Sequence, residues 1–155
     1  MNTYEQKVKD FLNQKTIAIA GVSRNPKGEV GNLIYKRFKE TGYNIFPVNP
    51  NAETIEGDKC YPNLKSIPQK VNAVFIATNP AISIEIVKQS IEAGVKTIWF
   101  HRSIGNGSFS EEAAKLGEEN GLLVIRSGCP MMFIDNADFG HKMIRFFMKI
   151  FGKLK

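Results

Sequence analysis

TIAIAGVSRNPKGEVG, residues 16–31, is the stretch that decides how the rest of the chain is interpreted. It begins with the apolar, β-branched run 16–20, which is typical of a strand buried on both faces of a parallel sheet. Gly21 follows at once and allows a sharp turn, because glycine has no Cβ. Gly31 then stands at the start of the helical pattern that follows. The stretch therefore predicts a strand, a turn and the beginning of a helix.

The turn itself is rich in hydrogen-bonding groups. Ser23, Arg24 and Asn25 lie between the two glycines, and the N–H groups at a helix N-terminus carry partial positive charge. Such a turn can hold a pyrophosphate. The pattern matches the dinucleotide fingerprint G-x-G-x-x-G only in part. An alternative is that Gly21 and Gly31 only permit a tight turn and close packing of the helix, and the stretch alone leaves both interpretations open.

Length and composition limit the class of protein. At 155 residues the chain fits one domain, 1–155, and is too short for a nucleotide-binding domain with a separate catalytic domain. Apolar runs fall short of the roughly 18 residues of a membrane span, and the N-terminus is too charged for a secretory signal. Cys60 and Cys129 show no metal-ligand spacing and are expected to be free thiols. We expect a cytoplasmic protein without a membrane span.

The charge balance points to an anionic partner. Lys and Arg exceed Asp and Glu by 21 to 15, which gives a formal net charge of +6. The basic residues are scattered except near the C-terminus, where they alternate with apolar residues as on an amphipathic helix over about 139–151. A docked helix with a solvated basic face is favoured over a helix that binds a membrane or nucleic acid. A protein partner could dock on this helix, and we expect no nucleic acid partner. The basic residues are Lys142, Arg145, Lys149, Lys153 and Lys155.

The remaining elements follow from hydrophobic periodicity. A short helix over about 3–13 is expected before the first strand, and further strands are expected at 43–48, 71–77, 95–100 and 122–126. Strand, helix and strand within about 35 residues form a right-handed βαβ unit with parallel strands. The prediction is an α/β, Rossmann-like, doubly wound domain with a five-stranded parallel sheet and helices on both faces. Numbering the five strands along the chain, we expect the order 3-2-1-4-5. Residues 57–68 are expected to be an irregular connection with one short turn of helix.

The end of the second expected strand bears on the ligand. An NAD-dependent dehydrogenase needs an Asp or Glu there to bind the ribose, and this chain has Val48-Asn49-Pro50-Asn51 instead. Asn49 could still hydrogen-bond a ribose or an adenine edge. The missing acid nevertheless weakens the case for NAD.

Three motifs carry a family resemblance: GVSRNP, YNIFPVNPN and ETIEGDKCYPNLKSIP. Over about 15–133 the chain resembles the single-domain CoA-binding proteins, whose fold is similar to the CoA-binding domain of the succinyl-CoA synthetase α subunit. The resemblance implies coenzyme A as cofactor. Succinyl-CoA synthetases carry their phosphorylated histidine on a second domain, for which this chain has no room, so ligase chemistry does not carry over. Under this hypothesis the phosphates are held by Gly21, Ser23, Arg24, Asn25 and Gly31, and the adenosine is surrounded by Val48, Asn49, Thr78 and Pro80.

Two further residues could carry chemistry. His101 follows the fourth expected strand, where a general base or a phosphate ligand is possible. Cys129 lies in a Gly-Cys-Pro loop and could meet the thiol end of CoA, although a buried, inert cysteine is the favoured interpretation. We expect a protein that binds CoA or an acyl-CoA without ligase chemistry of its own. The alternative is an NAD(P)-linked oxidoreductase or a small acyltransferase that uses the loops of His101 and Cys129.

Overall fold

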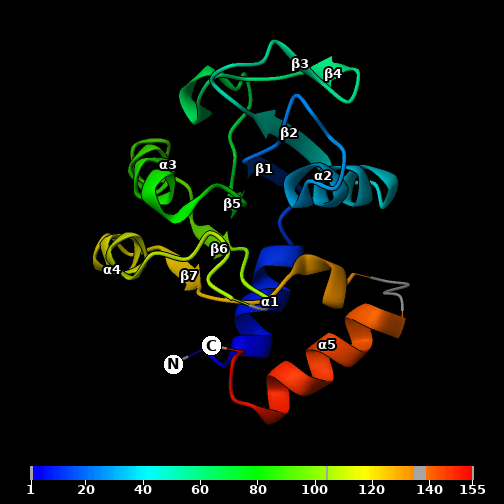
Figure 1. Cartoon of the computed structure of the whole chain (residues 1–155). Coiled ribbons are helices and arrows are strands. Elements are labelled where there is room, and N and C mark those ends of the chain that lie inside the picture. Colours follow the sequence, from blue (N-terminus) through cyan, green and yellow to red (C-terminus); the bar gives the residue numbers. More distant parts are fainter. Residues whose placement is uncertain (1, 104, 135–138, 155) are drawn as a thin grey trace.

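A parallel sheet of five strands forms the centre of the molecule in the computed structural model, which describes residues 2–103, 105–134 and 139–154 (Figure 1). Each strand is mostly apolar, because parallel strands covered on both faces bury most of their side chains. The predicted fold class is confirmed. In chain order the sheet strands are β1 (Thr16–Ala20), β2 (Asn44–Val48), β5 (Ala73–Ile76), β6 (Thr97–Phe100) and β7 (Leu123–Ile125).

Helices cover both faces of this sheet. The alternation along β1 shows the two faces: Ile17 and Ile19 belong to one apolar core, and Ala18 and Ala20 belong to the other. The first core is closed by α1 (Tyr4–Leu12), α2 (Val30–Glu40), the short η2 (Pro130–Met132) and α5 (Phe139–Ile150). The second is closed by η1 (Leu64–Ser66), α3 (Pro80–Glu92) and α4 (Glu111–Glu119). None of the helices in the described ranges is long and apolar enough to cross a membrane.

The predicted strand order is wrong. The sheet runs β2-β1-β5-β6-β7, so the third sheet strand along the chain pairs with β1 and not with β2. Pro47 gives the physical reason, since its carbonyl accepts from the N–H of Tyr61 at 2.9 Å and its ring nitrogen therefore faces away from β1. A proline has no N–H for a ladder and is confined to such edge positions. The chain thus adds β2 on one side of β1 and the remaining strands on the other side, so the order of the sheet switches between β1 and β5.

The connection after β2 is more ordered than predicted. It contains a hairpin of β3 (Thr54–Ile55) and β4 (Asp58–Lys59), followed by the expected short turn of helix, η1. Glu56 and Gly57 form the tip with φ of 51° and 82°. Both angles are left-handed, as the type I′ turn of a two-residue hairpin requires. The hairpin lies at one end of the molecule in Figure 1, above β2.

The buried face of α2 is not the one that its apolar residues indicate. Helical periodicity favours Val30 and Leu33 as core-facing residues, but both are exposed, and Asn32 and Tyr35 are buried instead. The start of α3 is capped by Asn79, whose side chain accepts from the N–H of Ile82 at 3.1 Å.

Candidate functional site

Two glycines bring three backbone segments into direct contact at the end of β1. Gly21 has φ of 99°, and a Cβ built on it would lie 2.5 Å from the carbonyl carbon of Ala77. A Cβ built on Gly31 would lie 2.4 Å from the carbonyl oxygen of Gly21. Both positions therefore exclude any side chain, which favours close packing as the role of these glycines. The consequence is that the turns after β1 and β5 and the first turn of α2 lie side by side.

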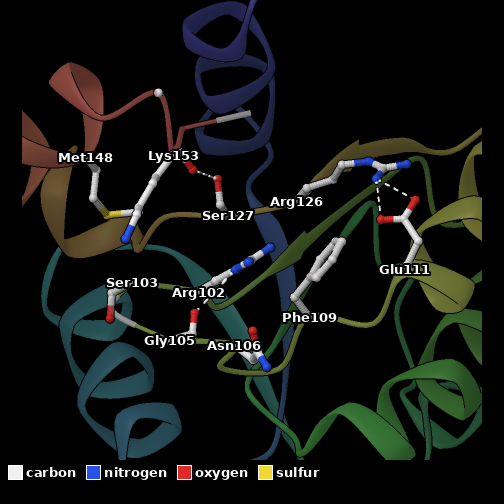
Figure 2. A pocket seen from close by; sticks show the side chains of 11 residues that line it. Arg102, Ser103, Gly105, Asn106, Phe109, Glu111, Arg126, Ser127, Met148 and Lys153 are labelled. Atoms are coloured by element: carbon white, nitrogen blue, oxygen red, sulfur yellow. Dashed lines mark hydrogen bonds and ion pairs between the residues drawn. The ribbon is translucent and has the colours of Figure 1, made fainter.

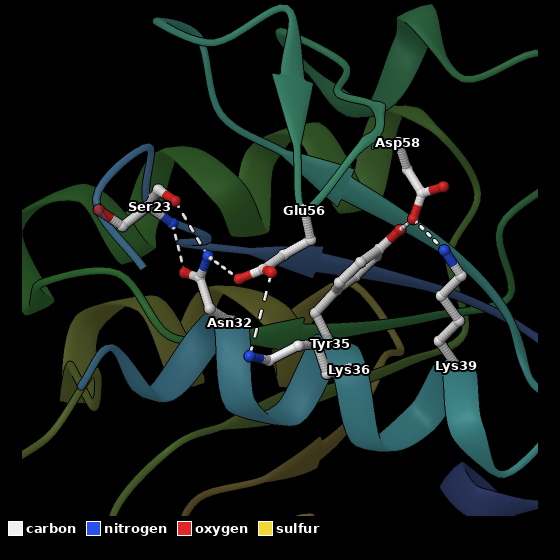
Figure 3. Close-up of polar contacts among 7 residues, drawn as sticks. All are labelled: Ser23, Asn32, Tyr35, Lys36, Lys39, Glu56 and Asp58. Carbon is white, nitrogen blue, oxygen red and sulfur yellow. Dashed lines mark hydrogen bonds and ion pairs between the residues drawn. The ribbon is translucent and has the colours of Figure 1, made fainter. Parts of the chain in front are cut away.

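Asn32 holds the turn that follows Gly21. It is 1% exposed, its Oδ1 accepts from the Ser23 N–H at 2.7 Å, and its Nδ2 donates to the Ser23 carbonyl at 2.9 Å. The same Nδ2 donates to Glu56 at 3.1 Å, and Glu56 pairs with Lys36 at 3.9 Å, as Figure 3 shows. A buried amide with both ends bonded to one residue fixes that residue's backbone. Sequence reasoning missed Asn32, although a polar residue on the core-facing side of a helix was a usable signal.

The hairpin that supplies Glu56 is itself fixed to α2. Tyr35 donates to the Asp58 carboxylate at 2.5 Å, and Lys39 pairs with the same oxygen at 2.5 Å (Figure 3). These two donors hold the pKa of Asp58 below its usual range. Burial together with the Asp58 contact raises the pKa of Tyr35, so its hydroxyl stays a donor. The β1 turn, α2 and the hairpin thus form one connected polar network.

An open depression of about 470 Å³ lies beside this network. Asn49 lines it and is already engaged, since its Nδ2 donates to the Val22 carbonyl at 2.7 Å and its Oδ1 accepts from the Asn51 N–H at 2.8 Å. The Ser23 hydroxyl accepts from the Asn25 N–H at 3.1 Å. None of the five lining residues is acidic, and one is an arginine, so the depression suits an anion. The lining residues are Ser23, Arg24, Asn25, Asn49 and Asn51.

The other predicted site residues do not line this depression. Val48 is buried at the end of β2, and Gly31 is buried beneath the β1 turn. Thr78 follows β5, and its hydroxyl is 3.0 Å from that of Ser83. Pro80 is exposed in the first turn of α3. The structure therefore brings Ser23, Arg24 and Asn25 of the β1 turn together with Asn49 at the depression. Thr78 and Pro80 lie on the turn that follows β5.

The loops of His101 and Cys129 meet elsewhere along the same sheet edge. Arg102 and Gly128 form an antiparallel bridge there, beside a second recess of about 410 Å³. Figure 2 shows the Arg102 guanidinium beside the Phe109 ring, 4.8 Å from its centroid, and Arg126 turned toward Glu111 at 2.9 Å. The cations that line this recess are therefore largely occupied by contacts within the protein.

Cys129 is buried in the apolar core, and His101 is partly buried. The His101 ring is 6.0 Å from the Phe75 ring, and burial lowers the pKa of His101. Burial raises the pKa of Cys129 to about 11, so its thiol is protonated at neutral pH. Neither residue lines the recess beside its loop. The geometry favours a structural role for Cys129, which is the interpretation preferred from sequence.

Comparison with known proteins gives one consistent result. A family model described as a CoA binding domain matches residues 15–135. A hypothetical protein from Pyrococcus horikoshii is 34% identical and superposes with a TM-score of 0.76, over 84% of this chain and 88% of that one. The uncharacterized protein YneT from Bacillus subtilis is 26% identical over 83% of this chain and 92% of its own length.

Longer relatives are similar to this chain over only a small part of their own length. The ADP-forming acetate–CoA ligase II of Archaeoglobus fulgidus is 34% identical over 113 residues, which are 72% of this chain. Those residues are only 16% of the ligase. The chain therefore spans a small fraction of the curated ligases it matches.

Proposed function

The chain belongs to the CoA-binding domain family, and from that premise we propose that it binds coenzyme A or an acyl-CoA at the depression beside the β1 turn. Ser23, Arg24 and Asn25 hold the phosphates under this proposal. Val48 and Asn49 border the adenosine from the end of β2, and Thr78 and Pro80 border it from the start of α3. The protein has no ligase chemistry of its own in this proposal.

The observation that carries the proposal is the fixed β1 turn. Asn32 bonds both backbone groups of Ser23, and Asn49 bonds the carbonyl of Val22, so the turn keeps its shape without a ligand. A binding site that is already ordered loses little conformational entropy when it binds. Arg24 is exposed at the rim, where a guanidinium can form paired hydrogen bonds with a phosphate.

Two further observations support CoA over a dinucleotide. The end of β2 carries Asn49 where a ribose-binding acid is needed for NAD, and the Asn49 amide is already bonded within the turn. CoA also offers a 3′-phosphate, which a cationic rim favours. Functions that need His101 or Cys129 as reactive groups lose support, because neither residue lines the depression, Cys129 is buried and His101 is partly buried. The two buried free thiols fit the reducing environment of a cytoplasmic protein.

Calorimetric titration of Arg24→Ala with CoA tests the site. We expect Kd to rise about tenfold or more, since a hydrogen bond to a charged group contributes about 1.5–3 kcal/mol. Lys88→Ala is the matched control, because it removes an exposed cation from α3 and gives the protein the same net charge as Arg24→Ala. Equal loss in both variants would mean that only net charge matters. Unchanged affinity in a folded Arg24→Ala protein would remove Arg24 from the site.

A further inference from the structure

The C-terminal helix presents an apolar face to solvent. Eight large hydrophobic side chains are exposed in the described part of the chain, and five of them lie on or directly after α5, between 41% and 68% exposed. In Figure 1, α5 lies at the opposite end of the molecule from the β3–β4 hairpin. An exposed cluster of this kind is uncommon on a protein without a docking function. Its members are Met143, Phe146, Phe147, Ile150 and Phe151.

The orientation of this face is fixed by contacts on the other side of the helix. Ile144 and Met148 pack into the core, and the Arg145 guanidinium lies 4.3 Å from the centroid of the Phe133 ring. Lys149 pairs with Glu5 of α1 at 3.3 Å. The Ser127 hydroxyl donates to the Lys153 carbonyl at 2.7 Å and holds the chain beyond the helix. The apolar face therefore points outward because the helix is docked by its opposite side.

The charged side chains of the same segment are all basic. Residues 139–155 contain four lysines and one arginine and no Asp or Glu. Lys142 and Lys153 are exposed at the two ends of the apolar face. An apolar helix face bordered by lysines is the pattern of a helix that lies in the interface of an anionic bilayer. There the aromatic and aliphatic side chains enter the boundary between headgroups and acyl chains, and the lysines meet the lipid phosphates.

We propose that this face binds the surface of an anionic lipid membrane. A second copy of the chain is the less favourable occupant, because a twofold interface places the same surface against itself. The exposed Lys142 and Lys153 of one copy would then approach those of the other, and residues 139–155 contain no acid to balance them, while Glu5 of α1 is already paired with Lys149. An anionic bilayer supplies both the apolar layer and the negative charge. The proposal is independent of the CoA site, since α5 contributes no residue to the depression.

Vesicle flotation of the full chain tests the proposal. With vesicles of phosphatidylcholine and phosphatidylglycerol in equal amounts, the protein should float in low salt, and less should float in high salt, which screens the lysines. With phosphatidylcholine alone, much less should float. Phe146→Ser should lower partitioning about tenfold or more, because the side chain is 61% exposed and loses its burial in the lipid. Leu33→Ser, at a 50% exposed position on α2, is the control and should float like the parent.

Three outcomes would overturn the proposal. One is failure of the parent protein to float with the anionic vesicles. Another is equal flotation of Phe146→Ser and the parent, which would assign the contact to another surface. The last is a dimer in sedimentation that Phe146→Ser dissociates while no vesicle binding occurs, which would make a second copy the occupant. Because Phe146 is exposed, an unchanged melting temperature verifies that the variant is folded.

Discussion

Gly31→Ala tests the packing at the base of the site. Intrinsic helix propensity alone predicts that alanine stabilises α2 by about 1 kcal/mol. The structure predicts the opposite sign, because the new Cβ would lie 2.4 Å from the carbonyl oxygen of Gly21 and 2.9 Å from its carbonyl carbon. These are backbone atoms that cannot rotate away. Overpacking of this kind costs about 1–3 kcal/mol or more.

With a cost near the upper end of this range, about 3 kcal/mol, and a propensity gain of about 1 kcal/mol, we expect a net loss of about 2 kcal/mol in the free energy of unfolding, or a fall of about 4–8 °C in Tm for a chain of this size. Urea denaturation followed by circular dichroism measures it. Gly117→Ala is the control within a helix, since its Cβ would meet the ends of the Ile98 and Val124 side chains at 3.0 and 3.1 Å, which can shift. Its stability should stay within about 1 kcal/mol of the parent. A Gly31→Ala protein as stable as the parent would refute the reasoning.

Three further predictions concern the polar network and the buried thiol of Cys129. Asn32→Asp should lower both Tm and CoA affinity, because a carboxylate would face Glu56 and the Ser23 carbonyl. Asn106→Asp, at an exposed position, is the control and should leave Tm unchanged. Asp58→Asn should destabilise the protein at neutral pH. Since the folded pKa of Asp58 is depressed, its contribution to the free energy of unfolding is complete above about pH 4 and is lost as pH falls through the folded pKa. The stabilities of the variant and the parent should therefore become equal in acid. A difference in stability that stays constant with pH would contradict this. Cys129 should resist iodoacetamide in the folded protein at neutral pH and react once urea is added, and rapid labelling without urea would show that it is accessible.

The fold class was predictable because burial on both faces leaves a clear local pattern. Residues 16–20 form β1 as predicted, and the apolar runs at 71–77 and 95–100 contain β5 and β6. The strand order was not predictable from hydrophobic periodicity, because periodicity shows which residues of a strand are buried but not which strands pair. Pro47 held the missing information, since a proline within a strand indicates an edge position. The hairpin was missed because its left-handed tip begins with Glu56, a residue that rarely adopts such a conformation.

The candidate site was predictable where its residues follow one another along the chain. Ser23, Arg24 and Asn25 lie in the turn that the glycines indicated, and Asn49 joins them because β2 pairs with β1. Asn32 was missed because its role depends on contacts with Ser23 and Glu56, nine and 24 residues away. The role of Gly31 could not be decided from sequence either, since packing against a carbonyl and exposure to a phosphate both require a residue without a side chain.

The claim that the chain binds CoA is tested most directly by calorimetric titration of the unmodified protein with CoA, dephospho-CoA and NAD at equal concentrations. We predict that affinity falls in that order, because the 3′-phosphate adds a contact with the cationic rim and the end of β2 lacks the acid that binds the NAD ribose. The preference for CoA should shrink at high salt, which screens exposed ionic contacts. Tight binding of NAD or NADP with no response to CoA would contradict the account.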